Sequence, residues 1–257
     1  MITDAVDSQI ERRLLVNYRI DADRVAALLP APFRPQLQRG WAVGGVCLIR
    51  LGELRLPHVP RVLGLRTENM AHRFAVEWGD DGERQVGVYV PRRDTSSRIS
   101  AWAGGKVFSG AYELARFSAD DQRSSLRITV TGTGGTTLVA VTAHEVLEMG
   151  GELFSSLEEA LDFFQRGARS FSPGWRRGAV DAVRLESGPW QARPVSIDGM
   201  SSSLFDDEEL FPPGSCVLDS GLVMREIEAR WVSEAGRGPT HERDAAAAST
   251  GKAQAQC

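Results

Sequence analysis

Two glycine-rich turn segments, each lying between runs of strand-like residues, constrain the fold of this chain more than any other feature. One is Gly79-Asp80-Asp81-Gly82 and the other is Gly132-Thr133-Gly134-Gly135. Glycine and aspartate readily adopt the backbone conformations of tight turns, so each segment predicts a β-hairpin. The flanking strand-like runs are residues 66–78 and 85–90 for the first turn, and residues 126–131 and 136–144 for the second.

Three further runs have the composition of strands, and two short segments predict helices. Asp21 begins a short amphipathic helix that Pro30 ends. The segment Ser156-Leu157-Glu158-Glu159 is a capping box, and it begins a helix that ends before Gly167. The pattern as a whole predicts an α+β fold that is mainly antiparallel β. The three further strands are predicted at residues 12–19, 41–51 and 225–232.

The composition is that of an ordinary soluble globular protein, with 42% hydrophobic and 25% charged residues. Periodicity stops near the C-terminus, so we predict a single domain over residues 1–235 and a disordered tail over residues 236–257. The formal net charge is -4, which provides no global positive field for nucleic acid or a membrane surface, and we expect neither partner. No apolar stretch approaches the roughly 18 to 20 residues of a membrane span, and the N-terminus lacks a signal-peptide pattern, so we expect a cytoplasmic protein.

The cysteines and the common catalytic motifs exclude several classes of site. Cys47, Cys216 and Cys257 are odd in number and form no Cys-x-x-Cys pair, so we expect reduced thiols, the first two buried in strands. The Gly132-Thr133-Gly134-Gly135 turn joins two strands and opens no helix, unlike a dinucleotide fingerprint. The segment His144-Glu145-Val146-Leu147-Glu148 lacks the second histidine of a zinc protease, and no Gly-x-Ser-x-Gly elbow is present. We expect no metal and no cofactor.

Lys106 is the one lysine in the predicted domain. Of the 30 lysine and arginine residues only Lys106 and Lys252 are lysine, and Lys252 lies in the predicted tail. An arginine does not deprotonate in proteins, whereas burial can lower the pKa of a lysine from about 10.4 toward 7 and make its amine nucleophilic. Such an amine forms a Schiff base with a ketone or aldehyde. The alternative is that Lys106 is a surface residue at the end of a glycine turn.

Several segments together resemble the acetoacetate decarboxylase-like superfamily over nearly all of the first 235 residues. Each motif is short, and their order and spacing carry the resemblance. They are Tyr18-Arg19-Ile20-Asp21 with the following Leu28-Leu29-Pro30-Ala31-Pro32-Phe33, then Thr67-Glu68-Asn69, then Gly104-Gly105-Lys106, and finally Ser203-Leu204-Phe205-Asp206. The residue before Lys106 and the residue after it, Gly105 and Val107, depart from the proline and second lysine of the decarboxylases. The chain is therefore most similar to the less characterised, YqjF-like branch of the superfamily.

The resemblance implies a cone-like barrel of antiparallel strands with a few short helices and a central cavity, and possibly a homo-oligomer. It also implies that Lys106 forms the Schiff base and that Glu68 is a catalytic-site glutamate. The arginine that meets the substrate carboxylate corresponds to Arg12 or Arg13. The residues Arg92, Arg93 and Arg98 are further candidates for holding a carboxylate, and Trp102, Val107 and Phe108 are candidates for desolvating the lysine.

Three functional hypotheses follow, of which the third, a structural or interaction protein, rests only on the acidic surface and the predicted tail. The first is a lyase-like enzyme that acts on a small oxo acid or related carbonyl compound through Lys106, with Glu68 positioning or transferring a proton. The second is a non-catalytic protein that binds a small metabolite in the same cavity, with Lys106 protonated and pairing with an anion. A structural alternative for Glu68 is an ion pair with Arg66 or Arg73, and a structural alternative for the arginines is a solvated surface.

Overall fold

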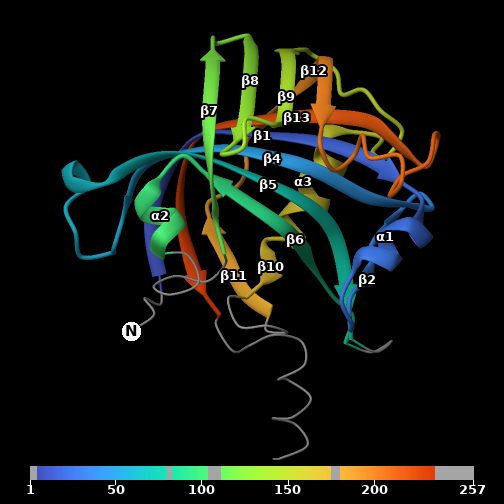
Figure 1. Cartoon of the computed structure of the whole chain (residues 1–257), viewed down its shortest axis with the longest axis horizontal. Coiled ribbons are helices and arrows are strands. Elements are labelled where there is room, and N and C mark those ends of the chain that lie inside the picture. Colours follow the sequence, from blue (N-terminus) through green and yellow to red (C-terminus); the bar gives the residue numbers. More distant parts are fainter. Residues whose placement is uncertain (1–4, 80–82, 104–110, 175–179, 235–257) are drawn as a thin grey trace, which may run out of the picture.

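The computed structural model describes residues 5–79, 83–103, 111–174 and 180–234. Strands dominate this part of the chain, and its helices are short (Figure 1). The strands are β1 (Ala5–Ile20), β2 (Arg34–Pro35), β3 (Leu37–Gln38), β4 (Trp41–Arg55), β5 (Leu65–Trp78), β6 (Gln85–Thr95), β7 (Glu113–Asp121), β8 (Ser125–Gly132), β9 (Thr137–Glu145), β10 (Arg169–Pro173), β11 (Val180–Ser187), β12 (Ala192–Ser202) and β13 (Cys216–Ser233). The helices are α1 (Ala22–Leu28), α2 (Arg98–Ala103) and α3 (Leu157–Arg166), with a 3-10 turn η1 (Arg61–Leu63).

The strands form one large, mainly antiparallel sheet that closes into a ring. Five long strands form a central wall in the order β13-β1-β4-β5-β6. The edges of this wall, β6 and β13, are joined along one path by β7-β8-β9-β12 and along another by β10-β11. In Figure 1 the first group of strands rises above the wall, and β10 and β11 lie below it. The predicted antiparallel fold is confirmed.

Both faces of the central wall are buried, because the two closing groups cover opposite sides of it. Side chains alternate between the faces of a strand. On the face that we call the hairpin face, wall residues such as Leu14 and Val46 pack against Ile128 of β8 and Val141 of β9. On the opposite face, the helix face, other wall residues pack against α3 and β11; they include Leu15, Cys47 and Ala75. This explains the apolar run near residues 41–51, which a sheet buried on both sides requires.

The predicted elements are present, and several are longer than predicted. The strand pairing of both hairpins is confirmed, as β5 with β6 and β8 with β9, although residues 80–82 of the first turn lie outside the described residues. The predicted strands at residues 12–19, 41–51 and 225–232 are parts of β1, β4 and β13, which run further because each pairs along its whole length with wall neighbours. Cys47 is buried as predicted, whereas Cys216 at the start of β13 is only partly buried.

Helix α3 begins and ends as predicted, but its N-terminal cap differs in one bond. The Ser156 side chain accepts a hydrogen bond from the Glu159 backbone N–H, at 3.2 Å. The Glu159 carboxylate accepts from the backbone N–H of Ser155, one residue before the cap residue of a standard capping box. The stripe of Ala160, Phe163 and Phe164 then packs on the helix face of the wall. Among the described residues no helix is both long and apolar enough to span a membrane, and the predicted tail, residues 236–257, lies outside them.

Candidate active site

Five charged side chains form a compact ion-pair cluster on the hairpin face of the wall. We call this group the charge cluster; it consists of Arg12 (β1), Arg50 (β4), Glu68 (β5), Asp121 (β7) and Arg225 (β13). Arg12 donates from Nη2 to Oε2 of Glu68 at 2.6 Å, and Arg50 donates from Nε to Oε1 of the same carboxylate at 2.6 Å. Both oxygens of Glu68 are therefore held by guanidinium groups.

Asp121 closes the cluster from the opposite side. Its Oδ2 lies 3.2 Å from Nη1 of Arg12 and 3.4 Å from Nη1 of Arg50. Its Oδ1 lies 2.9 Å from Nη1 of Arg225, whose Nε is in turn 3.8 Å from a carboxylate oxygen of Glu145. The contacts place Arg12, Glu68, Arg50 and Asp121 in a closed ring of alternating charge, which the strand order brings together from four different strands.

The charge cluster is largely buried, which distinguishes it from an ion-pair network on the surface. The Arg12 side chain is 0% exposed, and those of Asp121 and Glu68 are 11% and 16% exposed. A buried charge needs a partner, because removal from water is costly and the attraction between the ions must offset that loss. The more exposed edge of the cluster, formed by Arg50 and Arg225, is where a small molecule could reach it.

Glu68 is tied to the segment that leads toward Lys106. Its backbone N–H donates to Oγ of Ser96 at 2.9 Å, and its carbonyl oxygen accepts from the backbone N–H of Ser96 at 2.8 Å. Helix α2 begins two residues later. Lys106 follows the last residue of α2, Ala103, by three positions, and together with Val107 and Phe108 it lies outside the described residues. The two hydrogen bonds between Glu68 and Ser96 thus place the start of the segment that leads to Lys106 beside Glu68.

The structure distinguishes Arg12 from Arg13. Arg12 lies in the charge cluster, whereas Arg13 points to the helix face, where its guanidinium carbon lies 4.6 Å from the ring centre of Trp190. The predicted structural partners of Glu68 were wrong. Arg66 pairs with Glu11 across 2.5 Å, and Arg73 lies on the helix face, because odd-numbered residues of β5 point away from Glu68.

The other sequence candidates that the structure describes do not join the charge cluster. Arg92 pairs with Asp94 at 2.8 Å and with Glu113 at 2.9 Å. Arg93 donates to the hydroxyl of Ser170 on β10. Arg98 is exposed, and Trp102 of α2 is 67% exposed, which is more than a desolvating wall would leave. The three arginines therefore do not form one carboxylate clamp.

Sequence reasoning missed Arg50, Asp121 and Arg225. A signal for Arg50 was present, because it is the single charged residue in the apolar run at 41–51. Asp121 follows another aspartate near a turn, and Arg225 lies in a strand of alternating charge, so neither stood out. Their roles depend on which strands become neighbours in the ring.

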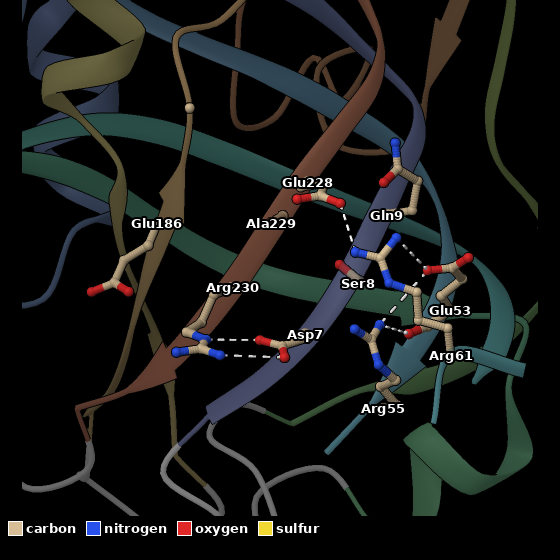
Figure 2. A pocket seen from close by; sticks show the side chains of 11 residues that line it. Asp7, Ser8, Gln9, Glu53, Arg55, Arg61, Glu186, Glu228, Ala229 and Arg230 are labelled. Carbon is tan, nitrogen blue, oxygen red and sulfur yellow. Dashed lines mark hydrogen bonds and ion pairs between the residues drawn. The ribbon is translucent and has the colours of Figure 1, made fainter. Parts of the chain in front are cut away.

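Two hollows on the described residues do not include Glu68 in their lining. The larger, of about 340 Å³, is lined by ion pairs that satisfy one another: Figure 2 shows Arg230 facing Asp7, and Arg61 facing Glu228 and Glu53. The hydrogen bond from Arg230 lowers the pKa of Asp7. The second hollow has about 260 Å³; its lining includes Ser96 and Arg98, which places it beside the segment that contacts Glu68. It is the more relevant of the two for a ligand.

A model of the family DUF2071, described as an uncharacterized conserved protein, matches residues 7–222. The chain belongs to the DUF2071 family. Among curated proteins no match was found.

Solved structures with a similar fold include acetoacetate decarboxylase and an acetoacetate decarboxylase-like enzyme. Acetoacetate decarboxylase from Legionella pneumophila has a TM-score of 0.60 and 11% identity, covering 91% of this chain and 88% of that one. An acetoacetate decarboxylase-like enzyme from Sphingomonas wittichii RW1 has a TM-score of 0.56 and 16% identity, covering 90% and 92%. The enduracididine biosynthesis enzyme MppR complexed with pyruvate has a TM-score of 0.55 and 12% identity, covering 90% and 89%. The DUF2071 chain therefore has the acetoacetate decarboxylase-like fold, as its sequence motifs predicted.

Proposed function

We propose that this DUF2071 protein is an enzyme that acts on a small oxo acid or related carbonyl compound through a Schiff base at Lys106. The observation that carries the proposal is the charge cluster, in which buried Arg12 holds Glu68 beside the segment leading to Lys106. Neighbours of the same fold include a decarboxylase and an enzyme complexed with pyruvate, which is a 2-oxo acid. They support the class of chemistry and leave the substrate of this chain open to test.

The proposed reaction needs a neutral amine and an electron sink. The Lys106 amine attacks the carbonyl carbon of the substrate, and one water molecule leaves as the imine forms. The protonated imine accepts the electron pair of a bond to the neighbouring carbon; if that bond leads to a carboxylate, carbon dioxide leaves and an enamine remains. The enamine carbon takes up a proton, and water then hydrolyses the imine, which releases the product and restores the lysine.

The charge cluster supplies two functions in this scheme. Glu68, with both oxygens bound by Arg12 and Arg50, is a carboxylate held in a fixed position beside the lysine-bearing segment, where it would position or transfer a proton. Arg50 and Arg225, at its more exposed edge, carry the guanidinium groups that could meet a substrate carboxylate. Arg12 is a positioning residue, because its side chain is enclosed and acts through Glu68 and Asp121.

Trapping of the imine tests the proposal. The protein is incubated near pH 7 with 2-oxo acids, 3-oxo acids and aldehydes, reduced with borohydride, and examined by intact-mass spectrometry and peptide mapping. A reactive compound should add its own mass less one oxygen atom, because water is lost and two hydrogens are gained. The adduct should map to Lys106, disappear in Lys106→Ala and persist in the matched control Lys252→Ala. Absence of any adduct, with a lysine-dependent aldolase labelled in parallel, would overturn the imine mechanism.

One observation favours a second candidate, a non-catalytic protein that binds a small metabolite. Both oxygens of Glu68 are already occupied by guanidinium groups, as expected for a carboxylate that only organises positive charge. In that case Lys106 stays protonated, and Lys106→Arg should keep ligand affinity within about threefold. Calorimetric titration of that variant with whichever compound binds the unsubstituted protein separates the two functions.

A further inference from the structure

The helix face of the wall carries arginines that have no acidic partner among the described residues. Arg13 of β1, Arg73 of β5 and Arg93 of β6 point to this face, and none of them lies within 4 Å of a carboxylate of the described residues. On the hairpin face, in contrast, each arginine of the charge cluster touches at least one carboxylate. The two faces of one sheet therefore differ in how their positive charges are balanced.

Arg73 is the most enclosed of these residues. It is 4% exposed, and its guanidinium lies against the ring of Phe164 on α3, 4.7 Å from the ring centre. Nη2 donates to Oδ1 of Asn17 at 2.5 Å, while Nε and Nη1 are buried with no acceptor among the described residues. Burial is the main reason that the pKa of Arg73 is lowered to about 10; nearby Cys47 acts to raise this pKa, and the positive charge of Arg13 acts to lower it. Gly45 makes room for this guanidinium, because a Cβ there would lie 3.2 Å from Nη2.

Arg13 is half-buried, in contrast to the enclosed Arg73, and it therefore connects these two arginines to the surface. Its guanidinium stacks on Trp190, and its Nε and Nη1 are also buried without an acceptor. Cys47 lies on the same face between the two arginines, on β4, where it is 8% exposed. Arg13 and Arg73 thus each have an aromatic ring over one face and unused N–H groups at the edge.

We propose that the helix face holds a small oxyanion bound between Arg13 and Arg73. Two cations withdrawn from water with no carboxylate within 4 Å among the described residues are unfavourable, since no opposite charge there offsets the cost of their desolvation. An aromatic ring over a guanidinium leaves the in-plane N–H groups free, and these match the paired oxygens of a carboxylate or phosphate. Such an anion supplies the missing charge and the missing acceptors together. This site lies on the opposite face of the sheet from Glu68 and does not depend on the proposed Schiff-base reaction.

Calorimetric titration at low ionic strength tests the site with two probes, inorganic phosphate and sodium acetate, because both present the required oxygens. Sodium chloride at matched ionic strength is the control for screening. We expect saturable binding of at least one probe with one site per chain, and at least tenfold weaker binding in Arg13→Gln. Binding of phosphate alone would assign an inorganic anion, and binding of acetate would assign a carboxylate ligand.

A matched variant separates loss of the site from general loss of positive charge. Arg19 lies on the same strand and near the ring of Trp41, but it already pairs with Glu152, so Arg19→Gln should bind the probe as the unsubstituted protein does. Arg13→Lys keeps the charge and loses the paired N–H geometry, and we expect an intermediate affinity. Equal binding by Arg13→Gln and the unsubstituted protein, or no saturable binding of either probe, would overturn the proposal. Borohydride trapping at Lys106 should be unchanged in Arg13→Gln, so failure of this site and failure of the proposed function give different results.

Discussion

Arg12 and Arg13 are consecutive in the chain, yet their side chains lie on opposite faces of the same sheet. Arg12 binds Glu68 and Asp121 within the charge cluster, and Arg13 stacks on Trp190 next to the helix-face core. The alternation of side chains along β1 produces this separation. Two positions that resemble one another in sequence therefore serve different sites.

Replacement of Arg12 should destabilise the fold strongly. Arg12→Met removes the guanidinium that touches both Glu68 and Asp121, which leaves two largely buried carboxylates with fewer partners. We expect the free energy of unfolding to fall by about 3 to 5 kcal/mol in guanidinium chloride unfolding. The control is Arg66→Met, whose 66% exposed side chain pairs with Glu11 and should contribute less than about 1 kcal/mol. Similar losses in both variants would contradict the structural importance of the cluster.

His72 should make stability depend on pH in the mildly acidic range. Burial, with a smaller contribution from the positive charge of Arg92, lowers the pKa of His72 to about 4. Between about pH 6.5 and pH 4 the unfolded chain binds the proton and the folded chain does not, so stability is full above this window and decreases as the pH falls through it. The total decrease from this group is about 3 kcal/mol, measured by urea unfolding at several pH values.

The control for this pH effect is the exposed His144, which pairs with Asp198 at 2.9 Å. His72→Phe should remove most of the dependence between pH 6.5 and pH 4, and His144→Gln should retain it. Because the comparison is of slopes, it holds even if loss of the bond from His72 to Ser202 lowers stability at every pH. An unchanged slope in His72→Phe would show that other groups cause the effect.

The cap of α3 should contribute measurably to stability. Ser156→Ala removes the acceptor for the Glu159 backbone N–H, and we expect a loss of about 1 kcal/mol in chemical unfolding. Asp21, which caps α1, makes no side-chain cap hydrogen bond, so Asp21→Ala should change stability by only a few tenths of a kcal/mol, about the size of an ordinary surface substitution. A larger effect at Asp21 than at Ser156 would contradict this assignment.

Any side chain at position 45 should lower the stability of the fold. A Cβ at this position would lie 2.4 Å from the carbonyl oxygen of Val16 as well as close to Arg73, so Gly45→Ala forces β1 and β4 apart. We expect a loss of about 2 to 3 kcal/mol, measured by thermal and chemical unfolding. The matched control is Gly134→Ala, because a Cβ at Gly134 meets nothing within 4 Å. That variant should be as stable as the unsubstituted protein within about 0.5 kcal/mol.

Much of the local structure was determined by short-range sequence patterns. The strand pairs that flank the two glycine-rich turns, the Ser156 cap and the helix end before Gly167 depend on residues within a few positions of one another, and the structure confirms them. Residues 80–82 of the first turn lie outside the described residues. The motifs around Glu68 and Lys106 also predicted the family and its fold correctly. Such motifs are recognised by their order and spacing along the chain, which the sequence contains directly. Strand lengths were underestimated, because pairing with neighbours extends a strand beyond its own pattern.

The tertiary structure alone decided which charged groups meet. Arg12, Arg50, Glu68 and Asp121 come from four strands, and their contacts follow from the order in which those strands join the ring. Three features depend on which face of the wall a side chain occupies. They are the different positions of Arg12 and Arg13, the identity of the partners of Glu68, and the helix-face arginines that have no acidic partner among the described residues. From the sequence one can predict that side chains alternate between the two faces of a strand. Which face the odd-numbered and the even-numbered residues occupy is decided only when distant strands pair and close the sheet.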